Sequence, residues 1–306
     1  MDLRQLAALV AVAEAGSFSG AARLLHTVQS NVSTHVARLE RELGATLVDR
    51  TTGSLTDEGD AVVDRARRVQ HELESLKADV EALLHDVSGN VRVGCIGTVG
   101  RWLVPRLIES VRDRYPKVAL VVVDATTTSL MPQLLSERLD LAVVNLPLND
   151  PDVAVQPLFD EDRIVIAPDD HPLSKLDRVS FAELTAHELL LEPQGTAFRD
   201  ELDRTAEAAG LTLRSLAEVD GLRLVASLAF EGFGPAILPA TAVPSWLDGA
   251  WHRISVEGLA SRQVGLAHRR RARLSAPARA VRESIEAIVA QADLPGVHPR
   301  LAEGTG

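Results

Sequence analysis

Apolar residues recur every three or four positions through residues 1–44, and this spacing predicts three short helices. The first helix, which Gly16 is placed to end, has one apolar stripe made of Leu3, Leu6, Leu9, Val10 and Ala13. Ser17 or Ser19 is placed to cap a second helix, which is expected to bury Phe18, Ala21, Ala22, Leu24 and Leu25. A third helix stops at Gly44, and its apolar face consists of Val32, Val36, Leu39 and Leu43.

The opposite face of the third helix is polar and mostly uncharged. At about 100° per residue, this face contains Ser30, Thr34, Ala37 and Arg41, with Gln29 and Ser33 beside it near the start. On an arbitrary helix such a face is simply solvated. Here a short helix, a tight turn and a second helix are typical of a helix-turn-helix, whose recognition helix enters the major groove N-terminus first. Gln, Ser and Thr side chains reach base edges there, so we predict that this face contacts DNA.

A heptad repeat follows. Apolar residues alternate at spacings of four and three: Val62, Ala66, Val69, Leu73, Leu76, Val80, Leu83 and Val87. A helix from Asp57 to Val87 would be about 46 Å long at 1.5 Å per residue. A stripe this narrow packs either on a domain of its own chain or on a second copy, and we expect dimerisation.

Strands and helices alternate beyond Ser88, Gly89 and Asn90. The extended segments NVRVGCIG, VALVVVDA and LDLAVVN alternate with helical patterns over residues 101–115 and 130–138. This alternation predicts parallel strands with crossover helices, and ligands lie beyond the carboxyl ends of such strands. Those ends, and a later turn in LLLEPQGTAF, carry Thr98, Thr127, Thr128 and Thr196. Any one of these threonines could be a simple helix cap; together with free backbone N–H groups they also suit an anion or a polar metabolite.

Composition and charge narrow the possible classes. The chain has 306 residues, of which 46% are hydrophobic and 25% charged, as in ordinary globular proteins. No run approaches the roughly 18 apolar residues of a membrane span, and Asp2 stands where a secretory signal needs positive charge. We therefore expect a cytoplasmic protein. The net charge of −11 argues against a polyanion held by the whole surface, but not by one local face.

Reactive and metal-binding groups are few. Cys95 is the only cysteine, which excludes an intrachain disulfide, and its apolar surroundings predict a packing role rather than a redox role. The histidines show no metal-ligand spacing, and the sequence contains no nucleotide loop and no nucleophile elbow. We expect no metal, no cofactor and no catalysis.

From Phe18 to Arg50 the sequence FSGAARLLHTVQSNVSTHVARLERELGATLVDR resembles the N-terminal signature of the LysR-type transcriptional regulators. LTDEG from Leu55 resembles its continuation, so the match spans about sixty residues in register, far more than a short motif. LDLAVVNLP, HPLS and GFGPAILP resemble later landmarks of the family, and the resemblance extends to about Ala292.

The resemblance implies an α/β fold with an N-terminal all-α winged helix-turn-helix, a long linker helix and a two-lobed, periplasmic-binding-protein-like effector domain. The expected domains are 1–56 for DNA binding, 57–87 for dimerisation and 88–292 for effector binding and oligomerisation, followed by a flexible tail at 293–306. Within the effector domain, the first subdomain is expected at about 91–160 and 266–292, and the second at about 161–265.

The resemblance also implies partners and site residues. We expect a homodimer or homotetramer that reads an interrupted inverted repeat in double-stranded promoter DNA and responds to a small effector, polar or carboxylate. The expected DNA-binding residues are Gln29, Ser30, Ser33, Thr34, Arg38 and Arg50. The expected effector-binding residues are Thr98, Thr127, Thr128, Asn145 and Thr196.

Departures from the family pattern predict a low affinity for DNA. Val28 stands where a Ser or Thr usually caps the recognition helix, so either Thr27 caps one residue earlier or the helix starts less firmly. Val48 replaces a phenylalanine, and the wing TTGS lacks the arginines often found there. Residues 1–58 carry five arginines against seven acidic residues, a net charge of −2. Since phosphate contacts supply nonspecific affinity, we expect strong dependence on dimerisation.

Two other classes share the two-lobed design. A solute-binding protein of the periplasmic type would carry a signal peptide and no N-terminal helices. A cytosolic metabolite-binding protein or enzyme would need, if catalytic, a reactive side chain among the cleft threonines, and the sequence offers none. Specific retardation of the chain's own upstream DNA would distinguish a regulator from both.

Overall fold

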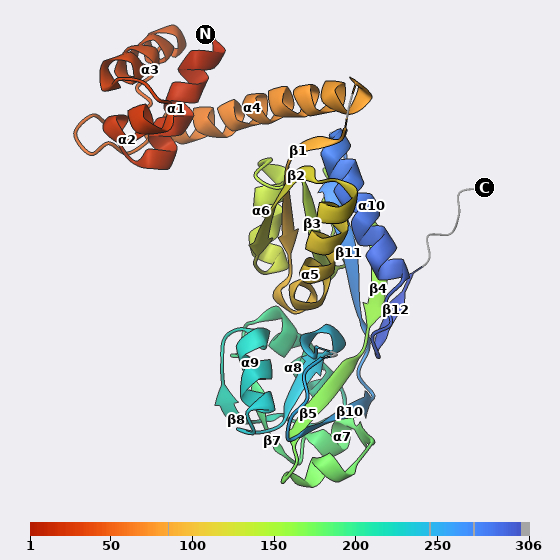
Figure 1. Ribbon diagram of the computed structural model, residues 1–306. Coiled ribbons are helices and arrows are strands. Elements are labelled where there is room, and N and C mark those ends of the chain that lie inside the picture. Colours follow the sequence, from red (N-terminus) through yellow and green to blue (C-terminus); the bar gives the residue numbers. More distant parts are fainter. Residues whose placement is uncertain (85, 245, 272, 301–306) are drawn as a thin grey trace.

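The computed structural model describes residues 1–84, 86–244, 246–271 and 273–300, which form a helical head, one long helix and two α/β lobes (Figure 1). The head contains α1 (Leu3–Ala15), α2 (Phe18–Leu24) and α3 (Gln29–Leu43), followed by a small wing where Val48 and Leu55 pair antiparallel. The long helix is α4 (Asp57–Leu84), which leads from the head to the lobes (Figure 1).

The helix ends in the head follow the predicted capping residues. Gly16 and Gly44 end α1 and α3 in the left-handed conformation, at φ 63° and 68°. Ser17 caps α2 by accepting the Gly20 N–H at 3.1 Å. Leu24 and Leu25, predicted to be buried, are instead 54% and 39% exposed. The reason is that the short helix α2 packs through its small residues, since Gly20, Ala21 and Ala22 are the ones buried.

The linker helix α4 has 28 residues, which corresponds to about 42 Å. It is described from Asp57 to Leu84, short of the predicted Val87, and the first strand begins at Ser88. Gly59 lies where α4 crosses the wing: a Cβ there would come within 2.0 Å of the Leu47 carbonyl oxygen.

The first lobe is built on a sheet of order β12-β4-β11-β3-β1-β2. Its strands are β1 (Ser88–Cys95), β2 (Lys117–Asp124), β3 (Leu141–Leu146), β4 (Val153–Glu161), β11 (Arg262–Arg269) and β12 (Val297–Pro299). Strand β1 pairs parallel with β2 and β3, as predicted, whereas β11 runs antiparallel to β3 and β4. The covering helices are α5 (Gly97–Arg114), α6 (Thr127–Leu135) and α10 (Ala276–Ala290), with α6 on the face away from α5 and α10 (Figure 1).

The second lobe is built on a sheet of order β6-β10-β5-β9-β7-β8. Its strands are β5 (Arg163–Pro168), β6 (Arg178–Ser180), β7 (Glu188–Leu191), β8 (Arg214–Glu218), β9 (Ala236–Pro239) and β10 (Trp251–Glu257). Its helices are α7 (Phe181–Leu184), α8 (Ala197–Ala208) and α9 (Leu222–Phe230), with short 3-10 turns at Pro172–Lys175 and Ala240–Ala242. Separate apolar clusters fill the two faces of this sheet.

Two crossings join the lobes, one between β4 and β5 and one between β10 and β11. Residues 262–265, expected in the second subdomain, belong to β11 of the first sheet. The prediction of a flexible tail from residue 293 is wrong for residues 297–299, because β12 pairs antiparallel with β4. Leu294 and Val297 are each only 6% exposed, so burial of two apolar side chains offsets the Pro- and Gly-rich composition. Residues 301–306 lie outside the described residues.

The described ranges contain no single helix with the length and apolar character to cross a membrane, although α1 and α2 together meet those limits while bent by 114°. No three His, Cys, Asp or Glu side chains in the described part of the chain gather where a metal ion could be held.

Candidate DNA-binding and effector sites

Helix α3 begins at Gln29 with no side chain capping it. Val28 occupies the N-cap position and makes no side-chain cap hydrogen bond. The Thr27 hydroxyl accepts from Asn31 Nδ2 at 3.0 Å and, among the described residues, from no backbone N–H, so of the two alternatives the cap one residue earlier does not form. The Asn31 N–H bonds the Val28 carbonyl at 3.1 Å, whereas among the described residues the N–H groups of Gln29 and Ser30 have no acceptor, which suits a phosphate oxygen.

The outer face of α3 is exposed, while its inner face is fully buried. Val32, Val36 and Leu39 are each at most 1% exposed. The exposed residues of the outer face include Gln29, Ser30, Thr34 and Arg38. The Thr34 hydroxyl donates to the Ser30 carbonyl at 2.8 Å, and among the described residues no hydrogen bond engages the side chains of Gln29, Ser30 or Arg38. The side chains of Gln29, Ser30 and Arg38 are therefore available to bind a partner.

Arg50 and Ser33, the other two predicted DNA contacts, are bonded to each other. Arg50 Nη1 donates to Ser33 Oγ at 3.1 Å, and Arg50 Nη2 lies 3.1 Å from Glu40 Oε2. The guanidinium also lies 5.5 Å from the centre of the Phe18 ring. Glu40 in turn accepts hydrogen bonds from the backbone N–H groups of Leu47 and Val48. This cluster therefore connects the wing to α3. The Arg50 side chain is still 50% exposed.

The heptad stripe of α4 divides into two halves. Ala66 is 1% exposed in the apolar core of the head, which removes it from the predicted dimerisation stripe, and Val62 is half-buried against the same core. The C-terminal half is exposed: Val69 40%, Leu73 37%, Leu76 61%, Val80 47% and Leu83 87%. This second half forms an apolar stripe on the surface of the chain, here called the seam.

Other side chains of α4 dock on the first lobe, a contact that sequence reasoning missed. His71 Nε2 lies 3.1 Å from Asp140 Oδ1, with both side chains largely buried. Hydrogen bonding to Asp140 raises the pKa of His71 and outweighs burial, which acts in the opposite direction. The second Asp140 oxygen accepts the Arg92 N–H at 2.7 Å, which fixes the carboxylate between β1 and α4. In the sequence, this contact was indicated by Asp140, an acidic residue within the apolar run LDLAVV.

Three predicted effector residues in the first lobe meet in one buried network. Arg262 Nη2 donates to the Thr98 hydroxyl at 2.7 Å, and Arg262 Nη1 donates to Asn145 Oδ1 at 3.3 Å. Thr127 Oγ1 accepts the Asn145 N–H at 3.0 Å. Arg262 Nε pairs with Glu161 Oε2 at 2.6 Å, and Glu161 is 0% exposed. The hydroxyls of Thr98 and Thr127 thus stabilise contacts within the first lobe. The sequence analysis did not predict the roles of Arg262 and Glu161.

The remaining predicted effector residues lie apart from this network. Thr128 is exposed, and its hydroxyl lies 2.9 Å from that of Thr126, the residue that caps α6. Thr196 belongs to the second lobe, and its hydroxyl donates to the Pro193 carbonyl at 2.9 Å. Among the described residues, no hydrogen bond links Thr196 to the first-lobe threonines, and the convergence of these threonines on one cleft stays a prediction.

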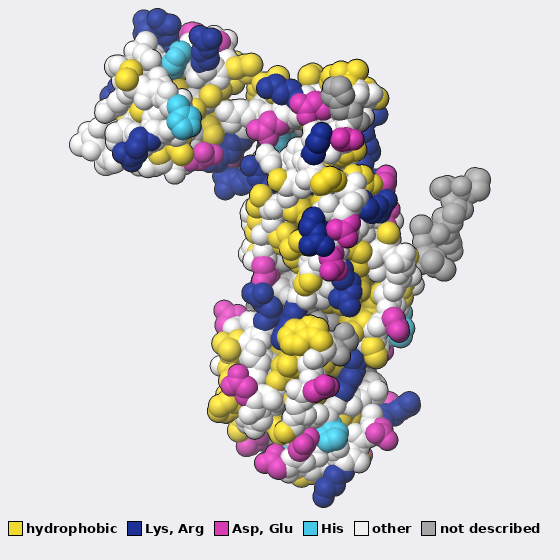
Figure 2. Space-filling view, viewed as in Figure 1, with side chains coloured by type: hydrophobic (Ala, Val, Ile, Leu, Met, Phe, Trp, Pro, Cys, Tyr) yellow, Lys and Arg dark blue, Asp and Glu magenta, His cyan; other side chains and the backbone are white. Residues whose placement is uncertain are grey.

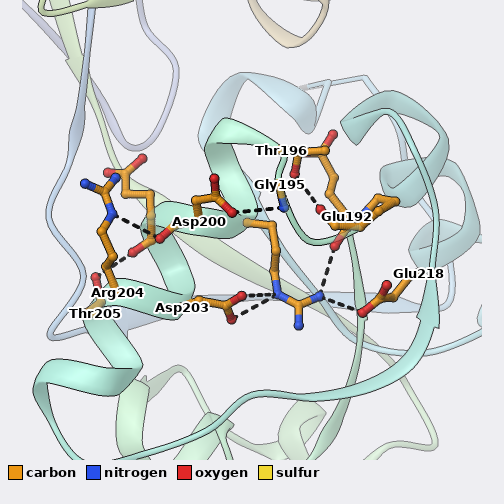
Figure 3. A network of polar contacts seen from close by, with 11 residues as sticks. Glu192, Gly195, Thr196, Asp200, Asp203, Arg204, Thr205 and Glu218 are labelled. Carbon is orange, nitrogen blue, oxygen red and sulfur yellow. Dashed lines mark hydrogen bonds and ion pairs between the residues drawn. The ribbon is translucent and has the colours of Figure 1, made fainter.

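The turn that carries Thr196 is part of an acidic network in the second lobe (Figure 3). The buried Arg199 contacts Asp203 at 2.9 Å, Glu218 at 3.0 Å and the Glu192 carbonyl at 3.0 Å. Asp200 accepts the Gly195 N–H at 3.0 Å. Burial raises the pKa of Glu192, with Asp220 adding to the effect. The surroundings of Thr196 are therefore rich in carboxylates.

Cys95 is 1% exposed at the end of β1, in agreement with a packing cysteine. Burial raises the pKa of its thiol to about 12. The thiol is consequently protonated at neutral pH and lacks the thiolate that reacts with oxidants.

Comparisons with known proteins agree with this architecture. Residues 3–60 match the family described as "Bacterial regulatory helix-turn-helix protein, lysR family", and residues 85–289 match "LysR substrate binding domain". A probable hydrogen peroxide-inducible genes activator of Streptomyces viridosporus is 36% identical over 245 residues, covering 79% of this chain and 78% of that protein. The DNA-binding transcriptional dual regulator OxyR of Escherichia coli is 32% identical over 273 residues, covering 88% and 90%.

Solved structures are similar over nearly the whole chain. A full-length OxyR variant from Pseudomonas aeruginosa has a TM-score of 0.75 at 26% identity and covers 98% of this chain and 99% of its own. Full-length CbnR in complex with its target DNA has a TM-score of 0.70 at 25% identity and covers 94% and 99%.

Proposed function

The chain belongs to the LysR family of DNA-binding transcriptional regulators, and from that premise we propose how its residues divide the work. The outer face of α3 reads base edges through Gln29, Ser30 and Thr34, while Arg38, Arg50 and the free N–H groups of the first turn contact phosphates. Ser33 reaches DNA only through Arg50, to which it is bonded. The observation that carries this proposal is the exposed outer face of α3, where the side chains of Gln29, Ser30 and Arg38 have no hydrogen-bond partner among the described residues, while the inner face is buried.

The seam supplies the second reading head in this proposal. Val69, Leu73, Leu76, Val80 and Leu83 of two chains pair, so that two weakly binding heads hold the two halves of an interrupted inverted repeat. A tetramer forms when effector domains associate as well. Because DNA is the partner, we place the protein in the cytoplasm, and the proposal contains no catalytic step.

The signal in this proposal is a small molecule bound between the lobes. Binding changes the angle between the lobes and hence the spacing of the heads, a coupling typically worth about 1–3 kcal/mol. Thr127, Thr128 and Asn145 border the first-lobe side of the cleft, and Thr196 borders the second. Thr98 acts from beneath, by positioning Arg262.

A substitution at Gln29 tests the reading face. We expect Gln29→Ala to weaken binding to the chain's own upstream intergenic DNA about tenfold or more, because one base-edge contact is worth about 1–3 kcal/mol. Binding to a scrambled fragment of equal length should not change. Arg38→Ala is the matched control: it should weaken both fragments alike and lower the salt slope by about one.

The measurement is a mobility-shift titration at several salt concentrations, with circular dichroism to confirm folding. If Gln29→Ala weakened both fragments equally, α3 would bind DNA without reading it, and the assigned face would be wrong.

Several relatives, among them the Streptomyces viridosporus protein, carry names that connect them with hydrogen peroxide, so the redox chemistry available to this chain needs to be considered. A disulfide within the chain needs two cysteines, whereas Cys95 is alone, buried and protonated. We therefore propose that the signal is ligand binding rather than oxidation of Cys95. Peroxide at concentrations that oxidise an exposed thiol should leave both DNA binding and the free-thiol count unchanged, and Cys95→Ala should keep the effector response. Loss of one titratable thiol together with altered DNA binding would overturn this.

A further inference from the structure

A pocket of about 280 Å³ lies where the head, the linker helix α4 and the first lobe meet. Helix α1 of the head contributes Glu14, and α4 contributes four residues, among them Glu74. The first lobe contributes Arg92 from β1, and Glu137 and Arg138 from the loop after α6. No described residue of the second lobe lines this pocket, and neither does any of the predicted effector residues, so it is separate from the space between the lobes.

Glu137 is the most enclosed acid of the pocket. Its side chain is 10% exposed, and its Oε1 atom pairs with Arg269. The other oxygen, Oε2, is buried without a hydrogen-bond partner among the described residues. The backbone of Glu137 is left-handed, at φ 64°, a conformation that glycine adopts more easily. The chain thus keeps a carboxylate at a strained position, and Arg269 accounts for only one of its two oxygens.

Two exposed carboxylates of the pocket also lack a partner. Neither Glu14 nor Glu74 forms a side-chain hydrogen bond or an ion pair within the described ranges. Glu14 lies on the head and Glu74 on α4, so each belongs to a different wall from Glu137. Figure 2 shows charged side chains of both signs below α4, between the head and the first lobe.

The arginines of the pocket do not neutralise these acids. Arg67 and Arg138 share Asp64, at 3.9 Å and 3.4 Å. Arg92 is the remaining guanidinium of the lining, and it has no ion pair among the described residues. The groups without a partner are therefore two whole carboxylates and one carboxylate oxygen against one guanidinium, an excess of negative charge.

The spacing of the carboxylates excludes a single small cation. Among the described residues, no three His, Cys, Asp or Glu side chains lie close enough together to hold one metal ion. A cation whose charges are separated along a chain can instead reach two walls at once, and each primary ammonium offers three donors. An extended organic cation therefore fits the arrangement better than a metal ion does.

We propose that this pocket binds a small linear diamine. One ammonium pairs with the Glu137 carboxylate, and the other lies between Glu74 of α4 and Glu14 of the head, in charge-assisted hydrogen bonds. Because the three walls belong to the head, the linker and the first lobe, the bound diamine holds the head and α4 against the lobe. This site does not depend on the proposed effector response.

Calorimetric titration of the full chain without DNA tests the pocket. The probes are putrescine and cadaverine, with butylamine, which has one ammonium, and γ-aminobutyrate, in which a carboxylate replaces the second ammonium. We expect putrescine to bind with a Kd below about 1 mM. Butylamine should bind about tenfold more weakly, because one charge-assisted hydrogen bond is lost, and γ-aminobutyrate should bind more weakly still.

Variants at the carboxylates identify the site. Glu137→Gln should lower the affinity for putrescine about tenfold. Glu74→Gln, at an exposed position that leaves the fold intact, should lower the affinity for putrescine and leave that for butylamine nearly unchanged. Glu72→Gln is the matched control, since Glu72 is exposed on the same helix but does not line the pocket, and it should bind putrescine like the unaltered chain.

Three outcomes overturn the proposal. The first is the absence of binding by putrescine up to about 10 mM, where a Kd near 1 mM would be visible. The second is equal binding by Glu74→Gln and Glu72→Gln, which would mean that diamines bind anywhere on a chain of net charge −11. The third is tighter binding by γ-aminobutyrate than by putrescine. None of these results affects the DNA-binding test at Gln29.

Discussion

The reading head and the effector lobes use the same kinds of polar side chain in opposite ways. On α3, Gln29 and Ser30 lie exposed, and their side chains have no hydrogen-bond partner in the described part of the chain. In the first lobe, Thr98 and Thr127 give their hydroxyls to Arg262 and to the Asn145 N–H. A polar side chain at a predicted site can therefore either be available to bind a ligand or stabilise the fold. Its hydrogen bonds within the chain distinguish the two cases.

The largest expected effect is on the stability of the buried network in the first lobe. Glu161 accepts Arg262 Nε at 2.6 Å and the Thr241 N–H at 2.5 Å, and it is completely buried. Glu161→Ala leaves the Arg262 charge buried without its partner, which should lower the free energy of unfolding by about 3–5 kcal/mol. Urea unfolding followed by circular dichroism measures it.

An exposed ion pair is the control for that experiment. Arg178 and Glu257 also form an ion pair, but their side chains are 68% and 57% exposed. Arg178→Ala should change stability by less than about 1 kcal/mol. Similar urea midpoints for the two variants would mean that the buried network contributes no more than a surface pair.

A smaller effect on affinity, with none on the fold, is expected at the seam. Leu76 is 61% exposed, so Leu76→Glu should leave the monomer intact but place a charge in the proposed dimer contact. Loss of the second head should weaken DNA binding about 100-fold. Sedimentation velocity measures the oligomer, with Lys77→Glu, the neighbouring exposed position off the seam, as control. A dimer that survives Leu76→Glu would place the interface elsewhere.

The smallest expected effect is the pH dependence of the docking of α4 on the first lobe. The pKa of His71 is raised in the folded chain, so its contribution is complete below the unfolded value of about 6.5 and is lost as pH rises through the raised value. We expect a loss of about 1 kcal/mol over that range, because the site is partly open to solvent.

Melting curves between mildly acidic and mildly alkaline pH measure this effect. His71→Gln should flatten the profile, whereas His252→Gln, in a pair that is more than half exposed, should not. An unaltered profile in His71→Gln would assign the pH dependence to other groups, such as Glu137 and Arg269, which also face His71.

Local features of the fold were predictable from the sequence, and distant pairings were not. Gly16, Ser17 and Gly44 act as caps because capping depends on a few neighbouring residues. The burial of Leu24 depends on how closely α2 meets other helices, and the apolar pattern alone gave the wrong answer.

The same limit applies to the candidate sites. Thr98 and Thr127 were found from strand ends, but Arg262 and Glu161 are 101 positions apart, and no local period connects them. The exposed face of α3 was predicted because one helix determines it. The packing of Val62 and Ala66 against the head was not predicted, because this tertiary contact does not follow from the local pattern of α4.

The strand β12 has a consequence for the solubility of the chain. By pairing with Phe159, Asp160 and Glu161, it covers the backbone N–H and C=O groups at the C-terminal end of β4, which would otherwise lie open at the edge of the first sheet. Open edges are templates for pairing with other chains, and prolines at an edge discourage further addition. Pro299 lies in β12, so the last described residues discourage strand addition at this end of the edge, and removing them would lengthen the open part of β4 by three residues.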